Sequence, residues 1–196
     1  MYRRYIKRVL DIIISIIGLM VLSPLFVILS ILIRLDDGGP VFFKQKRFGL
    51  GRKTFSLYKF RSMKVSAPAN CPTEALDNPD FWITKTGKWM RKTSLDELPQ
   101  ILNIIKGDMS IIGPRPVVLA EEALIDLRER YGANDIRPGL TGWAQINGRD
   151  EVGVKRKAIL DGEYVVRMSF LFDVKIFLLT FVDVLLEKGI HEGRQD

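Results

Sequence analysis

Residues 12–33 read IIISIIGLMVLSPLFVILSILI, and this uncharged stretch decides the fold. Its 22 residues are long enough to cross the hydrocarbon core of a bilayer as one helix. A cleavable signal peptide would be shorter and would end in small residues, whereas the charged sequence Arg34-Leu-Asp-Asp follows here. The sequence therefore predicts a membrane segment close to the N-terminus.

The middle of this segment holds Ser23 and Pro24. Proline removes a helical hydrogen bond and disfavours α geometry in the residue before it. Both flanks are basic: residues 1–11 carry four basic side chains against one acidic, and residues 34–64 carry nine against two. Because a spanning helix would leave one basic flank on the wrong side of the membrane, we expect residues 1–35 to form a re-entrant helix–break–helix anchor. A kinked spanning helix is the alternative. The Ser23 hydroxyl is the nearest partner for backbone groups freed at the break.

Residues 36–196 are expected to form one compact, mainly α-helical domain with a small β-hairpin, seated on the cytoplasmic face of the membrane. The stretches 41–46 and 53–60 flank a Phe-Gly-Leu-Gly-Arg turn and predict the hairpin. Helical patterns recur at 94–106, 117–131, 152–166 and 170–188. The last of these is amphipathic, which fits either an interfacial helix or a core-facing helix of a soluble domain.

Composition excludes several kinds of site. The chain has one cysteine, Cys71, and one histidine, His191, so an intramolecular disulfide, a Cys-x-x-Cys zinc site and a His-rich metal site are excluded. Acid–base or nucleophilic chemistry then falls to carboxylates, lysines or hydroxyls. The net charge of +7 is concentrated beside the hydrophobic segment, which favours anionic lipid head groups and phosphates over nucleic acid.

The clearest candidates for chemistry are Asp96 and Glu97, in the sequence RKTSLDELPQ. As structural residues they would cap a helix that begins here, with Asp96 as the N-cap or with Ser94 and Glu97 as a capping box. As functional residues they would lie at a helix N-terminus near Arg91, a place that attracts phosphate and keeps a carboxylate ionised. Such a carboxylate could act as nucleophile or metal ligand. The residues alone leave both interpretations open.

Two further segments offer phosphate-binding groups in rigid surroundings. Arg115 lies between two prolines, which restrict the backbone around a candidate phosphate clamp. The glycine-rich loop 137–149 also contains candidate phosphate-binding groups, namely two arginines and two side-chain amides.

Taken together, these motifs resemble the bacterial sugar transferases, small monotopic phosphoglycosyl transferases that begin the assembly of surface polysaccharides and glycoproteins. The matching motifs cover nearly the whole chain in order: Lys7-Arg8-x-x-Asp11, Ser23-Pro24, Tyr58-Lys59-Phe60-Arg61-Ser62-Met63, Ser94-Leu95-Asp96-Glu97-Leu98, Gly113-Pro114-Arg115-Pro116, Arg137-Pro-Gly-Leu-Thr-Gly-Trp-Ala-Gln145 and Ser169-Phe-Leu-Phe-Asp173. The stretch 66–90 departs from the pattern, and we expect it to be variable and to bear on sugar choice.

The resemblance implies a transferase that moves a sugar-1-phosphate from a UDP-sugar to undecaprenyl (polyprenyl) phosphate, at the cytoplasmic face of the bacterial inner membrane. It implies that Asp96 attacks the phosphate bearing the sugar and releases UMP, and that Glu97 holds Mg²⁺. The implied phosphate contacts are Arg91, Lys59 and Arg115, and the implied nucleotide contacts are Arg137, Gln145 and Arg149. Membrane lipids are further expected partners, and the sequence does not decide between a monomer and a homodimer.

Two other functions remain open at this point. A direct glycosyltransferase would use Asp96 as general base and release a nucleoside diphosphate. A non-enzymatic basic membrane adaptor would need these motifs only as structural caps and would turn over no nucleotide sugar.

Overall fold

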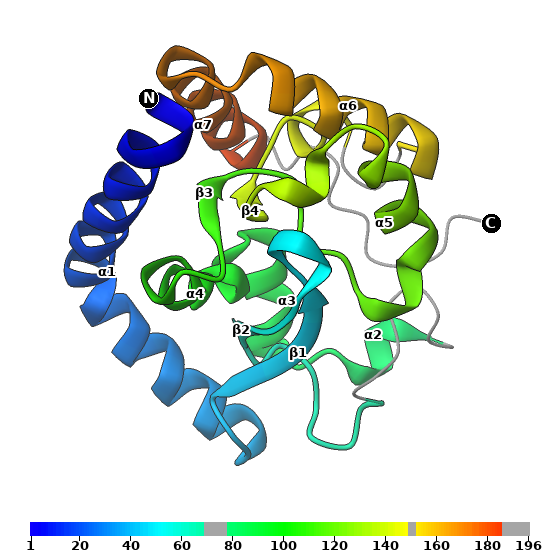
Figure 1. Ribbon diagram of the computed structural model, residues 1–196. Coiled ribbons are helices and arrows are strands. Elements are labelled where there is room, and N and C mark those ends of the chain that lie inside the picture. Colours follow the sequence, from blue (N-terminus) through cyan, green and yellow to red (C-terminus); the bar gives the residue numbers. More distant parts are fainter. Residues whose placement is uncertain (69–77, 149–151, 186–196) are drawn as a thin grey trace.

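The computed structural model describes residues 1–68, 78–148 and 152–185. Most of them are helical, and two small sheets lie in the middle of the molecule with helices around them (Figure 1). In chain order the elements are α1 (Lys7–Asp37), β1 (Phe42–Phe48), β2 (Thr54–Phe60), α2 (Pro79–Trp82), α3 (Lys85–Lys92), α4 (Gln100–Lys106), β3 (Ser110–Ile112), α5 (Glu122–Glu129), β4 (Gly139–Thr141), α6 (Val154–Arg167) and α7 (Phe170–Leu185). The predicted mainly helical fold with a β-hairpin is confirmed.

Helix α1 contains the uncharged stretch and curves around one side of the molecule (Figure 1). With the short helical turn before it, α1 is the one described helix long and apolar enough to cross a membrane. It continues through Pro24 as a single helix, so the expected break at Ser23 and Pro24 is wrong. Pro24 lacks the N–H that would bond the Met20 carbonyl, and the Ser23 hydroxyl donates to that carbonyl instead, at 2.8 Å. Because the lost hydrogen bond is replaced locally, the helix bends without ending. The re-entrant path through a membrane stays a prediction.

The two faces of α1 differ sharply. On its inner side Leu29 and Ile33 pack against Phe60 of β2 and Met90 of α3. Its outer side is apolar and exposed over most of its length: Ile13, Ile14, Ile17, Met20, Val21, Val27, Ile28, Ile31, Leu32 and Leu35. A continuous apolar surface of this extent marks an interaction site, and its composition suits lipid.

Helix α7 is amphipathic, and its polar side faces the protein. Asp173 and Ile176 are buried, and the Thr180 hydroxyl hydrogen bonds with the Thr141 hydroxyl of β4 at 2.8 Å. The outward side carries large exposed apolar residues: Phe170, Leu171, Phe177, Leu178, Phe181 and Val182. The helix therefore contacts the core and also adds a second exposed apolar surface to that of α1.

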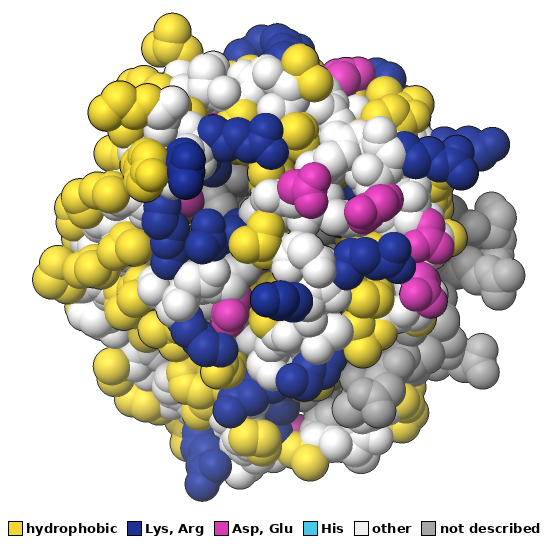
Figure 2. Space-filling view, viewed as in Figure 1, with side chains coloured by type: hydrophobic (Ala, Val, Ile, Leu, Met, Phe, Trp, Pro, Cys, Tyr) yellow, Lys and Arg dark blue, Asp and Glu magenta, His cyan; other side chains and the backbone are white. Residues whose placement is uncertain are grey.

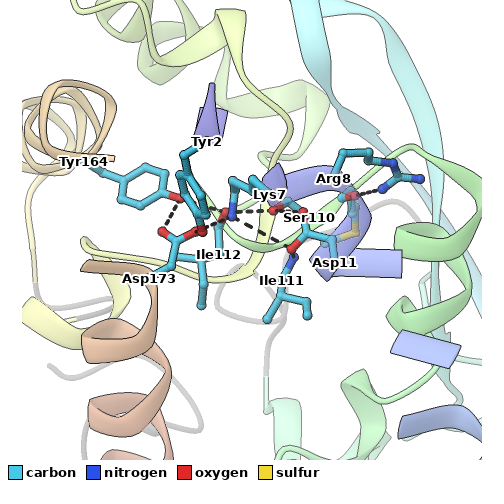
Figure 3. A network of polar contacts seen from close by, with 10 residues as sticks. Tyr2, Lys7, Arg8, Asp11, Ser110, Ile111, Ile112, Tyr164 and Asp173 are labelled. Atoms are coloured by element: carbon cyan, nitrogen blue, oxygen red, sulfur yellow. Dashed lines mark hydrogen bonds and ion pairs between the residues drawn. The ribbon is translucent and has the colours of Figure 1, made fainter. Parts of the chain in front are cut away.

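A buried polar cluster joins α1 to α7 and β3 (Figure 3). Lys7 Nζ lies 2.7 Å from a carboxylate oxygen of Asp173 and 3.9 Å from one of Asp11. Asp11 in turn accepts a hydrogen bond from the Ser110 hydroxyl at 2.7 Å. The remaining donors to these two carboxylates are the hydroxyls of Tyr2 and Tyr164 and the backbone N–H of Ile111. The first turn of the membrane helix is thus fastened to the domain by a charged and fully hydrogen-bonded group.

The predicted hairpin is present, and a second sheet was missed. β1 and β2 pair antiparallel, with Phe42 opposite Phe60. β3 and β4 pair parallel, and they lie in Gly/Pro-rich segments for which the sequence predicted no strand. A Cβ atom on Gly139 would lie 2.1 Å from the backbone nitrogen of Gly113, so only glycine allows these two loops to approach so closely.

Helix α3 was also missed, because its first six residues, 85–90, lie in the stretch 66–90 that was expected to be a variable loop. Its N-cap is Thr84, whose hydroxyl accepts a hydrogen bond from the Gly87 N–H at 3.0 Å. A Cβ atom on Gly87 would lie 1.9 Å from the Ser62 carbonyl oxygen, so α3 packs directly on the chain that follows β2. Residues 69–77 of this stretch lie outside the described residues.

The Ser23–Met20 hydrogen bond gives the first prediction, to be measured by thermal unfolding in lipid bicelles. Ser23→Ala should lower the stability by about 1–3 kcal/mol, because the Met20 carbonyl then has no donor within hydrocarbon. Pro24→Ala restores the backbone donor, so Ser23→Ala should cost much less in that background. Equal costs of Ser23→Ala in the two backgrounds would contradict this role for Ser23.

Candidate active site

Asp96 and Glu97 lie in a single 3₁₀ turn, Leu95–Glu97, between α3 and α4. The helix predicted over 94–106 begins only at Gln100, so Asp96 is not its N-cap. Ser94 precedes the turn with a φ of 55° and makes no capping hydrogen bond through its side chain. A non-glycine residue with positive φ is uncommon and reverses the chain sharply. Neither Asp96 nor the Ser94 side chain caps α4, so the capping interpretation is not supported.

Glu97 is held by two cations from distant parts of the sequence. Its Oε1 atom lies 2.8 Å from Lys59 Nζ and 2.9 Å from Arg115 Nη2. Its Oε2 atom lies 3.5 Å from Arg115 Nη1. Burial alone would raise the pKa of Glu97, but the charges and hydrogen bonds of Arg115 and Lys59 outweigh it and hold that pKa far below its usual value. Glu97 is therefore an ionised carboxylate whose Oε2 has capacity for a further cation.

The neighbouring Asp96 is shifted the other way. Its side chain is buried, and Lys59 Nζ lies 4.0 Å from its Oδ2. Burial raises the pKa of Asp96, and the negative charge of Glu97 adds to this against the attraction of Lys59 and Arg91. The sequence-based expectation that such surroundings favour an ionised carboxylate agrees with the lowered pKa of Glu97, whereas the pKa of Asp96 is raised. Adjacent acids with oppositely shifted pKa values are typical of a catalytic pair with divided roles.

The structure brings the predicted phosphate-binding groups together. Lys59 comes from the end of β2, Arg91 from the last turn of α3, and Arg115 from the loop after β3. The positive charge of each acts on Asp96. The side chain of Arg115 is 48% exposed, so this cation can be reached from outside, whereas the Asp96 side chain is only 11% exposed. The result is a recessed carboxylate pair with cations around it, an arrangement suited to a phosphate ester.

The predicted nucleotide-binding residues are not gathered at this place. Arg137 donates through Nε to the Gly107 carbonyl at 2.9 Å, at the other end of α4. Gln145 is buried, and its side-chain oxygen and nitrogen have no hydrogen-bond partner within the described part of the chain. It lies close to Gly142, next to the backbone of Gly113, and so beside the loop that carries Arg115. Arg149 lies outside the described residues.

Sequence reasoning missed the residues that hold the Arg115 loop in place. Arg128 of α5 donates to the Arg115 carbonyl at 3.0 Å and forms a buried ion pair with Asp161 of α6 at 2.7 Å. Arg47 of β1 donates to the Pro116 carbonyl at 3.2 Å. Charged residues on helices usually face solvent, so nothing in the sequence marks Arg128 and Asp161 as a buried pair.

The carboxylates offer a limited metal site. Among the described residues there is no group of three or more His, Cys, Asp or Glu side chains that could enclose a metal ion. Asp96 and Glu97 alone supply oxygen ligands, which fits Mg²⁺ because this ion is usually bound by one or two carboxylates together with substrate phosphates and water.

The comparison with protein families covers nearly the whole chain. Residues 2–187 match the family model described as bacterial sugar transferase. The chain belongs to this family. As a bacterial sugar transferase, it contains the Asp96–Glu97 pair and the Arg115 loop at the centre of its fold, on elements that the family match covers.

Several curated relatives align with nearly the whole chain. An uncharacterized sugar transferase, EpsL, of Bacillus subtilis is 41% identical over 95% of this chain and 91% of its own length. The UDP-glucose:undecaprenyl-phosphate glucose-1-phosphate transferase of Escherichia coli is 40% identical over 96% of this chain and 42% of its own length. The exopolysaccharide production protein ExoY of Sinorhizobium fredii is 39% identical, over 94% of this chain and 88% of its own length. The chain thus spans less than half of the Escherichia coli relative.

The opposite pKa shifts of the two acids predict opposite effects on stability. A raised pKa in the folded state means that ionised Asp96 costs stability above that pKa, and the cost vanishes below the ordinary aspartate value. Asp96→Asn should therefore stabilise the fold at neutral pH, on the order of 1–3 kcal/mol, with the gain shrinking as the pH falls.

Glu97→Gln is the matched control and should behave in the opposite way. The lowered pKa of Glu97 contributes stability that is present above its ordinary value and is lost on acidification. This variant should therefore lower the melting temperature at neutral pH. Melting curves from about pH 4 to 8 measure both effects, and a loss of stability in Asp96→Asn at neutral pH would contradict the raised pKa of Asp96.

Proposed function

We propose that this bacterial sugar transferase moves a sugar-1-phosphate from a UDP-sugar to polyprenyl phosphate through a covalent intermediate on Asp96. The observation that carries the proposal is the buried Asp96 beside an ionised Glu97 with Lys59 and Arg115 in contact. The printed name of the Escherichia coli relative, a glucose-1-phosphate transferase acting on undecaprenyl phosphate, supports the same reaction class. Another relative is named an N-acetylgalactosaminephosphotransferase, so the donor sugar varies within the family.

In the first step an Asp96 carboxylate oxygen attacks the phosphorus that bears the sugar. The bond from that phosphorus to the bridging oxygen of the diphosphate breaks, and UMP leaves with the electron pair. The product is an acyl phosphate between Asp96 and the sugar-1-phosphate. A raised pKa suits this role, because a more basic carboxylate is a stronger nucleophile once it has lost its proton.

In the second step the phosphate oxygen of polyprenyl phosphate attacks the same phosphorus. The bond between that phosphorus and the Asp96 carboxylate oxygen breaks. Asp96 is regenerated as a carboxylate, and a polyprenyl diphosphate sugar is formed. Lys59, Arg91 and Arg115 bind and orient the phosphates in both steps. Positioning and charge stabilisation of this kind provide most of the rate in phosphoryl transfer.

Glu97 and Asp96 would hold Mg²⁺ in this proposal. When bound, the ion supplies positive charge to the crowded phosphate oxygens. Glu97 Oε1 already contacts Lys59 and Arg115, so Oε2 is the better placed oxygen for a metal. Gln145 is the described residue of the 137–147 segment best suited to a nucleotide, because its buried amide lies beside the Arg115 loop with its polar atoms still available.

The apolar outer faces of α1 and α7 support a seat in the membrane. Both faces expose large aliphatic and aromatic side chains, and the polar cluster of Lys7, Asp11 and Asp173 lies on the inner side between them (Figures 1 and 3). We infer that α1 enters the cytoplasmic leaflet, bends at Pro24 and returns to the same side, which leaves both basic flanks in the cytoplasm. The acceptor lipid then reaches Asp96 without leaving the bilayer.

The nucleotide released in turnover tests the proposed reaction. With membrane-embedded protein, a UDP-sugar, Mg²⁺ and polyprenyl phosphate, we expect UMP. Release of UDP would indicate direct glycosyl transfer with Asp96 as base, and no turnover with any UDP-sugar would indicate an adaptor.

A further inference from the structure

Two arginines lie at the C-terminal end of α4, away from the acid pair. Arg8 of α1 donates to the carbonyls of Ile105 and Met109, each at 3.3 Å. Arg137 donates to the carbonyl of Gly107, which lies between those two residues in the chain. A Cβ atom built on Gly107 would lie 3.4 Å from Arg8 Nη2. The two guanidinium groups therefore converge on one turn of backbone.

Neither arginine forms an ion pair with an acidic side chain in the described part of the chain. The acids nearest in sequence to Arg8 and to Gly107 have other partners, since Asp11 accepts the Ser110 hydroxyl and Asp108 contacts Lys106 at 3.0 Å. A helix C-terminus favours a nearby cation, but a second cation beside the first is repelled. An anion bound between them would remove this repulsion.

The hydrogen bonds observed leave donors for such an anion. An arginine side chain has five N–H donors, and Arg137 uses Nε for Gly107. Its two terminal amino groups have no hydrogen-bond partner among the described residues, and both guanidinium groups are only partly buried. The terminal fork of Arg137 and the second N–H of each Arg8 amino group are therefore left for a phosphate, which accepts such bonds from guanidinium groups.

The position of Arg8 and Arg137 favours the phosphate of a lipid head group over the phosphates that react at Asp96. Exposed apolar side chains lie near it in the chain, with Val9 next to Arg8 on α1, Tyr5 in the helical turn before α1, and Leu102 on α4. Figure 2 shows Lys and Arg side chains gathered between the apolar outer edge formed by α1 and the centre of the molecule. Helix α4, whose seven residues span roughly 10 Å at about 1.5 Å per helical residue, lies between Glu97 and Gly107, so a phosphate held here is not in contact with Asp96.

We propose that Arg8 and Arg137 form a second phosphate site, which binds the head group of an anionic bilayer phospholipid and fixes the depth of the domain against the membrane. The site rests on the proposed membrane seat and is separate from the reacting phosphates. It reassigns Arg137, which the sequence suggested for the nucleotide.

The test measures binding of phosphatidylglycerol to the full chain in neutral detergent micelles, followed by the rise in melting temperature. Arg8→Gln and Arg137→Gln should each weaken the apparent affinity roughly tenfold, the loss expected for one charge-assisted pair of hydrogen bonds. Arg4→Gln is the matched control, because it removes the same charge from an exposed neighbouring residue and should change the affinity less than about twofold. Arg8→Lys and Arg137→Lys keep the charge and lose the fork, and should fall between.

Three further arms separate the sources. Phosphatidylcholine should give a much smaller shift in the wild type, and inorganic phosphate at the same concentration should give none. The KM values for UDP-sugar and for polyprenyl phosphate should not follow the lipid affinities across the variants.

Equal losses of lipid affinity for Arg4→Gln and Arg137→Gln would show that only the total charge matters and would overturn the site. A raised KM for polyprenyl phosphate or UDP-sugar with unchanged lipid binding would return Arg137 to the reaction. UMP release in the wild type is read separately, so failure of the lipid site is distinguishable from failure of the proposed reaction.

Discussion

The ion pair between Lys7 and Asp173 is the contact on which the arrangement of the molecule depends. It joins the first turn of α1 to the first turn of α7 at 2.7 Å, and both side chains are buried. These are the two helices that turn apolar faces outward, so the pair sets how the two surfaces align. Removing one partner would leave a charge buried without compensation, which typically costs about 3–5 kcal/mol. Hydroxyl donors complete the cluster and help to offset the desolvation of these buried charges.

The site of Asp96 and Glu97, before the N-terminus of α4, contains one acid whose charge is stabilised and one whose charge is not. Glu97 is stabilised by Lys59 and Arg115, whereas Asp96 sits beside it in a position that disfavours its charge. A fold selected only for stability would not place a carboxylate there. The strain is local: Ser94 takes a positive φ, and Arg128 and Arg47 fix the carbonyls of the loop that delivers Arg115. The buried charge of Asp96 destabilises the fold, and the surrounding contacts of Glu97, Arg128 and Arg47 stabilise it.

Sequence reasoning predicted what depends on local pattern and composition. The uncharged stretch forms one helix and the hairpin is present. The family resemblance placed Lys59, Glu97 and Arg115 at one site, and the three side chains are in contact. Sequence reasoning failed where long-range packing overrides local preference. The parallel pairing of β3 with β4 depends on two glycine loops that approach closely, and periodicity cannot reveal this. The helix continues through Pro24 because one serine hydroxyl replaces one backbone donor, a detail that a proline rule cannot anticipate.

The position of Arg137 shows the same limit. A motif groups residues by sequence, and the 137–147 segment bends so that Arg137 faces α4 while Gln145 faces the Arg115 loop. Residues of one motif can therefore serve different places, and only the three-dimensional contacts separate them.

Intact-protein mass spectrometry of the enzyme mixed with a UDP-sugar and Mg²⁺, without polyprenyl phosphate, tests the central claim most directly. The account predicts a mass increase equal to one sugar phosphate on the wild type, under conditions that preserve an acyl phosphate. The added mass should disappear when polyprenyl phosphate is supplied, and it should be absent from a folded Asp96→Asn protein. Normal turnover by Asp96→Asn, or the same adduct on that variant, would contradict the assignment of Asp96 as the nucleophile.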